Sequence, residues 1–109
     1  MLFVIVPPTM RHELDDYTVT ANYSITMSCE ATGLPPPVVT WSRGGVPLEL
    51  STNDSNTDGT QLFPNGVLRI GRAHINDSGT YECVATNVAG SVTRHVRLRV
   101  QGDILHLLI

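Results

Sequence analysis

Cys29 and Cys83 are the only two cysteines in this chain of 109 residues, and they bracket its single tryptophan, Trp41. The second cysteine closes the run DSGTYEC at residues 77–83. Two cysteines allow one intramolecular bridge, and the long loop that it would close predicts a contribution of about 4 kcal/mol to stability, comparable to the net stability of a small domain. The alternative is that both thiols stay reduced, as is usual in the cytosol.

A second signal bears on the compartment. Sequons for N-glycosylation begin at Asn22, Asn53 and Asn76. A lasting disulfide and N-glycans both require the secretory route, so together they predict an extracellular protein, although a three-residue pattern also arises by chance.

Composition excludes several other classes. Hydrophobic residues at 41% and charged residues at 16% are typical of one globular domain and indicate neither disorder nor a membrane span. The formal net charge of -3 supplies no broad positive field for nucleic acid. We therefore expect a single domain that binds no cofactor or nucleic acid and does not insert into a membrane.

Apolar residues alternate with period two, and no segment has a sustained helical period. The alternation predicts strands whose inward side chains are Ile25, Met27 and Cys29; Val39 and Trp41; Leu68 and Ile70; Tyr81, Cys83 and Ala85; and Val96, Leu98 and Val100. The chain is thus expected to be all-β.

Prolines and turn residues divide these strands. Pro7 and Pro8 predict a first strand that lies at an edge and is split into two parts, the second at residues 17–20. Residues 43–61 are rich in Gly, Ser, Thr, Asn and Asp, which predicts a connecting loop with at most one short strand near residues 46–50. Asn65-Gly66 between apolar runs predicts a hairpin.

Beyond the hairpin, the sequence GRAHINDSGTYEC predicts a corner between two strands. Ala73 and Ile75 are expected to plug the base of the core there. The residues from Asn87 to Gly90 are expected to turn the chain into its final strand.

Taken jointly, these motifs resemble an immunoglobulin-like domain of the intermediate (I) set over residues 7–101. The motifs that carry the resemblance are Cys29, Trp41, LFPNGVLRI (62–70), DSGTYEC and ATNVAG (85–90). They are similar to repeats of hemicentin and of related adhesion and matrix proteins such as roundabout receptors and peroxidasin. The resemblance implies a two-sheet antiparallel Greek-key sandwich and a structural disulfide between Cys29 and Cys83 that packs against Trp41. It also gives Leu68, Asp77, Gly79 and Tyr81 as core signature residues, with the Tyr81 hydroxyl bonding the backbone at the corner.

One departure from the family pattern concerns Asp77. In many relatives this carboxylate pairs with an arginine or lysine one strand earlier. No basic residue lies between Arg43 and Arg69 here, so we expect the ion pair to be missing.

The sequence gives little support for a catalytic or metal-binding site. Redox-active cysteines usually sit close together at a helix start, unlike this distant pair. The four histidines, at positions 12, 74, 95 and 106, are scattered over separate elements, so no metal site is expected. Asp77, Ser78 and a histidine could form a hydrolytic set, but the turn already accounts for the first two, so we expect no enzyme.

The one cluster of basic residues lies on the last strand. Arg97 and Arg99 share its outward face, and they could contact an acidic partner or acidic glycans. We favour the alternative, a solvated face that discourages edge aggregation. Arg94 has inward parity, which predicts either a bulge or an error in the strand assignment.

The resemblance implies an extracellular adhesion or matrix module that binds other proteins, with neighbouring immunoglobulin-like domains or the same protein as candidates. Residues 1–6 are interpreted as the end of a preceding repeat or a linker, and residues 102–109 as a tail without an assigned role. Glycans on the three asparagines would leave the sheet with the final strands as the more accessible face. The alternatives are the ectodomain of a signalling receptor and an intracellular repeat of the sarcomeric kind.

Overall fold

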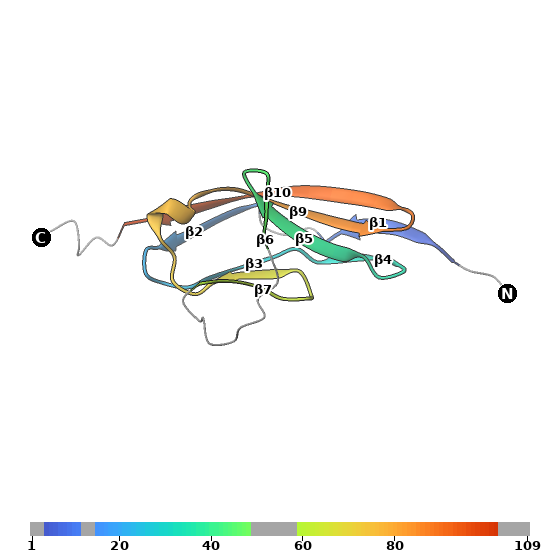
Figure 1. Ribbon diagram of the computed structural model, residues 1–109, viewed down its shortest axis with the longest axis horizontal. Coiled ribbons are helices and arrows are strands. Elements are labelled where there is room, and N and C mark those ends of the chain that lie inside the picture. The colour runs from blue at the N-terminus through green and yellow to red at the C-terminus, as the bar shows by residue number, and fades with distance from the viewer. Residues whose placement is uncertain (1–3, 12–14, 49–58, 103–109) are drawn as a thin grey trace, which may run out of the picture.

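The alternating runs of the sequence form strands that lie lengthwise in two layers (Figure 1). The structure, a computed structural model, describes residues 4–11, 15–48 and 59–102. In chain order the elements are β1 (Val6–Met10), β2 (Asp16–Thr20), β3 (Ile25–Ser28), β4 (Ala31–Leu34), β5 (Val38–Arg43), β6 (Val46–Leu48), β7 (Thr60–Leu62), β8 (Val67–Ile70), the 3₁₀ turn η1 (Ile75–Asp77), β9 (Gly79–Asn87) and β10 (Gly90–Gln101).

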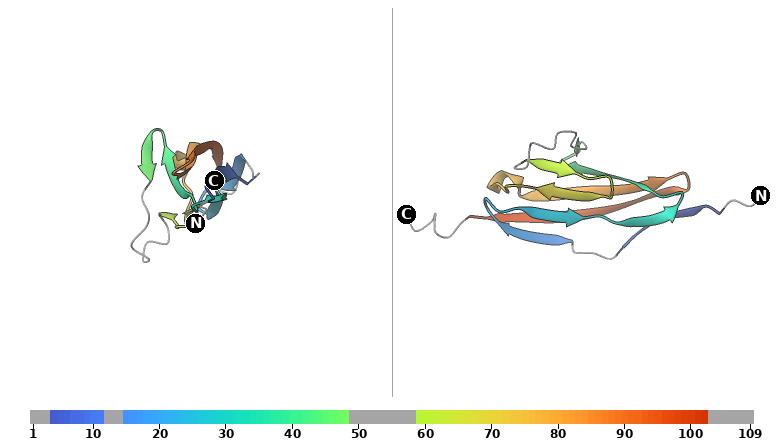
Figure 2. Two further views of the ribbon diagram at one scale, coloured as in Figure 1. Left: turned by 90° about the vertical axis from the view of Figure 1, so that its right-hand side faces the viewer. Right: turned by 90° about the horizontal axis from the view of Figure 1, so that it is seen from below.

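One layer is a five-stranded sheet with the order β2-β10-β9-β5-β6. The other consists of a three-stranded sheet, β3-β8-β7, and a two-stranded sheet, β1-β4. Figure 2 shows the layers packed along their length, with β1 beginning at one end and β10 finishing at the other. The predicted all-β sandwich is therefore confirmed.

The first strand is split into two parts, as predicted, and the structure places the parts in different layers. β1 pairs antiparallel with β4, whereas β2 pairs with β10 in the opposite layer. The β2-β10 pair is parallel over five partners, from Asp16↔Arg97 to Thr20↔Gln101. It departs from the predicted antiparallel pairing because β2 has changed layers while still running from the N-terminal end of the sandwich toward the C-terminal end.

The core between the layers is formed by the inward residues of both sheets. Its buried apolar members are Met27, Cys29, Trp41, Leu62, Leu68, Ile70, Ala73, Tyr81, Cys83, Val96, Leu98 and Val100. Period-two alternation thus places one apolar side chain in the core for every two residues along β8, β9 and the end of β10.

At the centre of the core, Cys29 and Cys83 form a disulfide that joins the two layers. Trp41 is the cross-strand partner of Cys83 in the β5-β9 pair, and its indole is almost wholly buried. The indole Nε1 donates a hydrogen bond to the carbonyl oxygen of Gly66, at 3.0 Å, in the facing layer. The buried donor is therefore satisfied, and the indole adds a polar link between the layers.

The turn that accepts this bond is the predicted hairpin between β7 and β8. The Phe63 N–H donates to the Val67 carbonyl at 2.9 Å, and the Asn65 Oδ1 accepts from the Val67 N–H at 3.3 Å. Gly66 has a φ of 86°, and a Cβ there would overlap the carbonyl oxygen of Cys29. Only glycine combines this backbone conformation with so close an approach to the core.

Two details of the sequence interpretation need correction. Ile75 was expected to plug the base of the core, but it is 56% exposed, and Ala73 alone is buried there. The reason is that residues 75–77 form a 3₁₀ turn, which breaks the period-two alternation. The expected loop at residues 43–61 is also shorter, because β5 continues to Arg43 and β7 begins at Thr60. The short strand expected near residues 46–50 is β6, and residues 49–58 lie outside the described residues.

The substitution Cys83→Ala should destabilise the domain severely. It opens a loop that spans 54 positions of sequence, which is worth about 4 kcal/mol on the chain-entropy model, and it leaves a cavity beside Trp41. Urea denaturation followed by Trp41 fluorescence measures the loss. A denaturation midpoint equal to that of the unaltered protein would contradict the prediction.

Candidate interaction surface

The outward face of the five-stranded sheet is the first candidate for a binding surface. While Val96 and Leu98 point into the core, Arg97 and Arg99 on β10 point to solvent. Cross-strand pairing sets Arg97 between Asp16 of β2 and Thr80 of β9. The sheet therefore presents a polar surface whose most prominent cations lie near its β2 edge.

Two shallow hollows lie along this edge, each of about 290 Å³. One is lined by Asp16, Tyr17, Thr18, Arg97 and Arg99, and the other by Asp15, Asp16, Thr80, His95 and Arg97. Within the described residues, Arg97 and Arg99 form no ion pair, so both guanidinium groups could bind a carboxylate or sulfate from outside.

A neighbouring histidine on the same face contacts a carboxylate. His95 Nε2 lies 3.3 Å from the Glu82 carboxylate, and both side chains are exposed to solvent. An exposed pair of this kind contributes little to stability. It leaves Arg97 and Arg99 as the cations of this face that are open to a partner.

Arg94 differs from these arginines. β10 pairs with β9 in continuous register from Gly90 to Leu98, so there is no bulge between these strands and Arg94 keeps its inward parity, opposite Cys83. Its side chain is only 11% exposed; Nε lies 2.9 Å from Asp15 Oδ1, and Nη1 donates to the Ser28 carbonyl oxygen at 3.2 Å. The strand assignment is therefore right and no bulge intervenes between these strands, so both alternatives drawn from the parity of Arg94 were wrong.

These contacts give Arg94 a structural role that the sequence interpretation missed. Ser28 belongs to β3, whereas Asp15 precedes β2, so one cation connects both layers close to the point where the first strand crosses between them. The signals in the sequence were the inward parity of an arginine and the acidic residues between the two halves of the first strand. The sequence does not show that these two features meet, because that depends on how β10 pairs with its neighbours.

The corner before β9 contains a second arginine contact. Arg43 Nη1 lies 3.8 Å from Asp77 Oδ1, and Nη2 donates to the carbonyl oxygens of Ser78, at 2.9 Å, and Asn76. The expectation that Asp77 lacks a basic partner was wrong. Arg43 ends β5, which adjoins β9 in the sheet although the two strands are far apart in sequence.

Tyr81 completes this corner. Its hydroxyl donates to the Asp77 carbonyl oxygen at 2.7 Å, and the Arg43 guanidinium carbon lies 5.3 Å from the centre of its ring. Burial raises the pKa of the Tyr81 hydroxyl above its ordinary value, an effect opposed by the nearby charge of Arg43 and reinforced by that of Asp77. At neutral pH the phenol is thus held as a hydrogen-bond donor.

The residues considered for hydrolysis are engaged with the backbone. The Asp77 carboxylate accepts from the His74 N–H at 2.8 Å and caps η1, while the Ser78 Oγ accepts from the Val100 N–H at 2.9 Å. Gly79, with a φ of 153°, follows directly and begins β9. These contacts account for the DSG sequence as a corner motif.

Two of the three sequon asparagines lie at one end of the sandwich. Asn22 lies in the β2-β3 turn with a φ of 77°, and Asn76 lies in η1; both are exposed. The Asn22 N–H donates to the Ala73 carbonyl at 2.8 Å, which joins the two turns at the C-terminal end. Asn53 lies outside the described residues.

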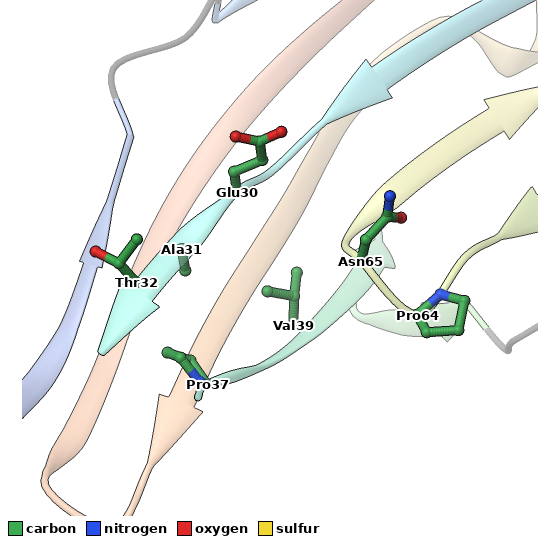
Figure 3. A pocket seen from close by; sticks show the side chains of 7 residues that line it. All are labelled: Glu30, Ala31, Thr32, Pro37, Val39, Pro64 and Asn65. Carbon is green, nitrogen blue, oxygen red and sulfur yellow. The ribbon is translucent and has the colours of Figure 1, made fainter. Parts of the chain in front are cut away.

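A further hollow of about 320 Å³, which the sequence did not predict, lies beside β4 (Figure 3). It is lined by Glu30, Ala31, Thr32, Pro37, Val39, Pro64 and Asn65. It opens before the start of β8 at Val67, where the edge of β4 that faces away from β1 has no neighbouring strand. It contains one carboxylate and no arrangement of a nucleophile with a base.

The described residues hold neither a metal-binding cluster nor a membrane-spanning helix. Across residues 4–11, 15–48 and 59–102, no three His, Cys, Asp or Glu side chains gather closely enough to hold a metal ion. His74 and His95 lie on separate elements, and His12 and His106 are outside these ranges. The same part of the chain contains no helix long and apolar enough to cross a membrane.

Comparison with known proteins gives consistent matches. The Immunoglobulin I-set domain family matches residues 8–100. Hemicentin-1 of Mus musculus is 40% identical over 100 residues, which cover 92% of this chain and 2% of hemicentin-1. The muscle M-line assembly protein unc-89 of Caenorhabditis elegans is 44% identical over 100 residues, which cover 90% of this chain and 1% of that protein. The chain thus spans a small part of the relatives that it matches.

Solved structures of immunoglobulin domains resemble this fold. The structure of Sidekick-1 immunoglobulin domains 1-5 has a TM-score of 0.77 and 31% sequence identity. The match covers 92% of this chain and 21% of the Sidekick-1 chain.

The raised pKa of Tyr81 predicts how stability depends on pH. Since the folded protein keeps the phenolic proton at a pH where the unfolded chain has lost it, this contribution is complete below the ordinary pKa of 10.0 and is lost as pH rises above it. The stability difference between the wild type and Tyr81→Phe should therefore shrink above about pH 10, by up to about 1.4 kcal/mol per pH unit. Urea unfolding between pH 8 and 11 measures it, with Tyr23→Phe as an exposed control. A constant difference would contradict the assignment.

The substitution Arg94→Met should destabilise the domain by about 1–3 kcal/mol, because it leaves the Ser28 carbonyl and Asp15 without their cation. Arg97→Met removes the same charge from the exposed face and should change stability by less than about 0.5 kcal/mol. Chemical denaturation of both variants makes the comparison. Equal losses would show that the inward position of Arg94 has no structural importance.

Proposed function

This chain belongs to the immunoglobulin I-set domain family, and from that premise we propose that it is a non-catalytic extracellular repeat through which a larger adhesion or matrix protein binds other proteins. The chain corresponds to one unit of a longer array, as its 21% share of the five-domain Sidekick-1 chain suggests. The observation that carries the binding proposal is the outward face of the five-stranded sheet, where Arg97 and Arg99 are open to solvent and form no ion pair within the described residues.

The positions of the sequons support this choice of face. Asn22 and Asn76 lie in turns at the C-terminal end of the sandwich and not on the outward face of β9 and β10. Glycans at these positions would cover that end and leave the sheet face open. Acidic groups are the matching chemistry for two adjacent guanidinium groups, whether they belong to a protein partner or to an acidic glycan.

Two other functions are retained because relatives carry them or the fold allows them. The similarity to unc-89, a muscle M-line assembly protein, favours an intracellular structural repeat as the second candidate. The third candidate is a receptor ectodomain that recognises a soluble ligand. It would use the same fold and the same kind of exposed binding face as an adhesion repeat. The oxidation state of the cysteines and the occupancy of the sequons separate the intracellular candidate from the other two.

The compartment is tested on the protein isolated from its native source. We expect intact-mass analysis to find the Cys29–Cys83 disulfide and peptide mapping to find a glycan on Asn22, whose side chain is exposed in a turn. Glycosidase treatment should then lower the mass of the protein. Two free thiols together with unmodified asparagines would reject the extracellular proposal in favour of the intracellular repeat.

The binding face is tested by charge. The double variant Arg97→Ala/Arg99→Ala should elute from heparin at a lower salt concentration than the wild type, because two cations of one face are removed. Arg11→Ala/Arg72→Ala makes the same change in net charge next to β1 and β8, which lie in the other layer, and serves as the control. Equal shifts for the two variants would mean that net charge alone governs retention and that the face is not a site.

A further inference from the structure

Large apolar side chains that face solvent gather at the N-terminal end of the sandwich. This end is formed by the residues that lead into β1, the β4-β5 connection and the β9-β10 turn (Figure 2). Its exposed apolar residues, which we name the N-terminal patch, are Val4, Ile5, Val6, Leu34, Val38 and Val88. Soluble domains rarely leave such a group uncovered unless something binds it.

A polar clamp holds the segments of the patch together. Asn87 Nδ2 donates to the Val6 carbonyl oxygen at 2.8 Å and to the Pro35 carbonyl oxygen at 3.0 Å. The Asn87 Oδ1 accepts from the Ala89 N–H at 2.8 Å. One side chain thus ties β1, the β4-β5 connection and the β9-β10 turn to each other, so the patch is fixed before any partner arrives.

The close approach of these segments is also visible at Gly33. A Cβ at this position would lie 3.0 Å from the Val6 carbonyl oxygen, 3.1 Å from Asn87 Nδ2 and 3.2 Å from the Pro37 ring. The backbone at the patch is therefore closely packed, while its apolar side chains point outward. The cross-strand pairing of Val6 with Leu34 places two of these side chains on neighbouring strands.

The opposite end has a different character. Tyr23 and Ile75 are exposed there, and each adjoins a sequon asparagine, Asn22 or Asn76. In the described part of the chain, the N-terminal patch contains no sequon asparagine. If the sequons are occupied, glycans cover the apolar residues of the C-terminal end and leave those of the N-terminal end bare.

We propose that the N-terminal patch packs against the preceding immunoglobulin-like domain of the same polypeptide. The proposal rests on the tandem arrangement put forward above. Val4, Ile5 and Val6 are the covalent path into β1 and are themselves part of the patch, so a folded domain joined to this segment is held within a few residues of it at high effective concentration. Three consecutive exposed apolar residues suit a covered junction and not a free linker.

This junction makes the two ends of the domain unequal. The preceding domain is held in a fixed orientation by apolar contact, whereas glycans attached to Asn22 and Asn76 would keep the following domain apart. Of the two interdomain hinges that a repeat can have, the N-terminal one is therefore the stiffer.

The test uses the natural two-domain fragment, with the preceding domain, and compares it with the isolated domain. Amide NMR resonances of Leu34, Val38 and Val88 should shift between the two forms, and this domain should melt at a higher temperature in the fragment. Val38→Lys should abolish both effects. The matched control is Val46→Lys, because Val46 is 64% exposed on β6, Val38 is 67% exposed, and only Val38 belongs to the patch.

Proton spectra of each isolated variant check that it still folds, and Val88→Lys replaces Val38→Lys if that variant does not. Identical resonances in the two forms, or equal effects of Val38→Lys and Val46→Lys, would overturn the proposal. A parent protein with no preceding immunoglobulin-like domain would do so as well. If the isolated domain sediments as a dimer that Val38→Lys dissociates, the occupant is a second copy and the proposal is wrong.

These outcomes are distinct from failure of the extracellular function. Coupling between the domains in a reduced, unglycosylated protein would reject the extracellular assignment and keep the junction. A glycosylated protein with an intact disulfide but no coupling between the domains would keep the extracellular assignment and reject the junction.

Discussion

The contact between the two layers at Trp41 is the constraint on which the other parts of the structure depend. The disulfide joins Cys29, at the end of β3, to β9, and the indole beside it donates its single N–H to the carbonyl of Gly66 in the facing layer. This bond ties the β7-β8 turn to the facing layer. Glycine is required in the turn because a Cβ at Gly66 would overlap the carbonyl oxygen of Cys29. A covalent bond, a ring and a tight turn therefore determine the spacing of the sheets, which the aliphatic side chains then fill.

Most of this arrangement could be predicted because it follows from local rules. Alternation gave the inward faces of β8, β9 and β10, and Asn65-Gly66 gave the hairpin. The prediction for Ile75 was wrong because a 3₁₀ turn replaces period two with period three at the corner. The Arg43–Asp77 pair escaped prediction because neighbours in this sheet are not neighbours in the sequence.

The candidate binding features were less accessible to sequence reasoning for a related reason. Alternation alone placed Arg97 and Arg99 on an outward face, but it could not show which groups on β2 and β9 lie beside them. Asn87 and Arg94 each connect segments far apart in the chain through side-chain bonds, which leave no period in the sequence. Membership of the family likewise establishes the architecture, and partners are chosen by such individual side chains.

The parallel pairing of β2 with β10 has a mechanical consequence. The chain enters the sandwich at one end and leaves it at the other, so tension between the ends draws these two strands past each other along their length. Five residue partners then resist sliding in concert, whereas a hairpin peeled from its turn yields one rung at a time. A repeat built in this way is suited to transmit pulling forces without unravelling.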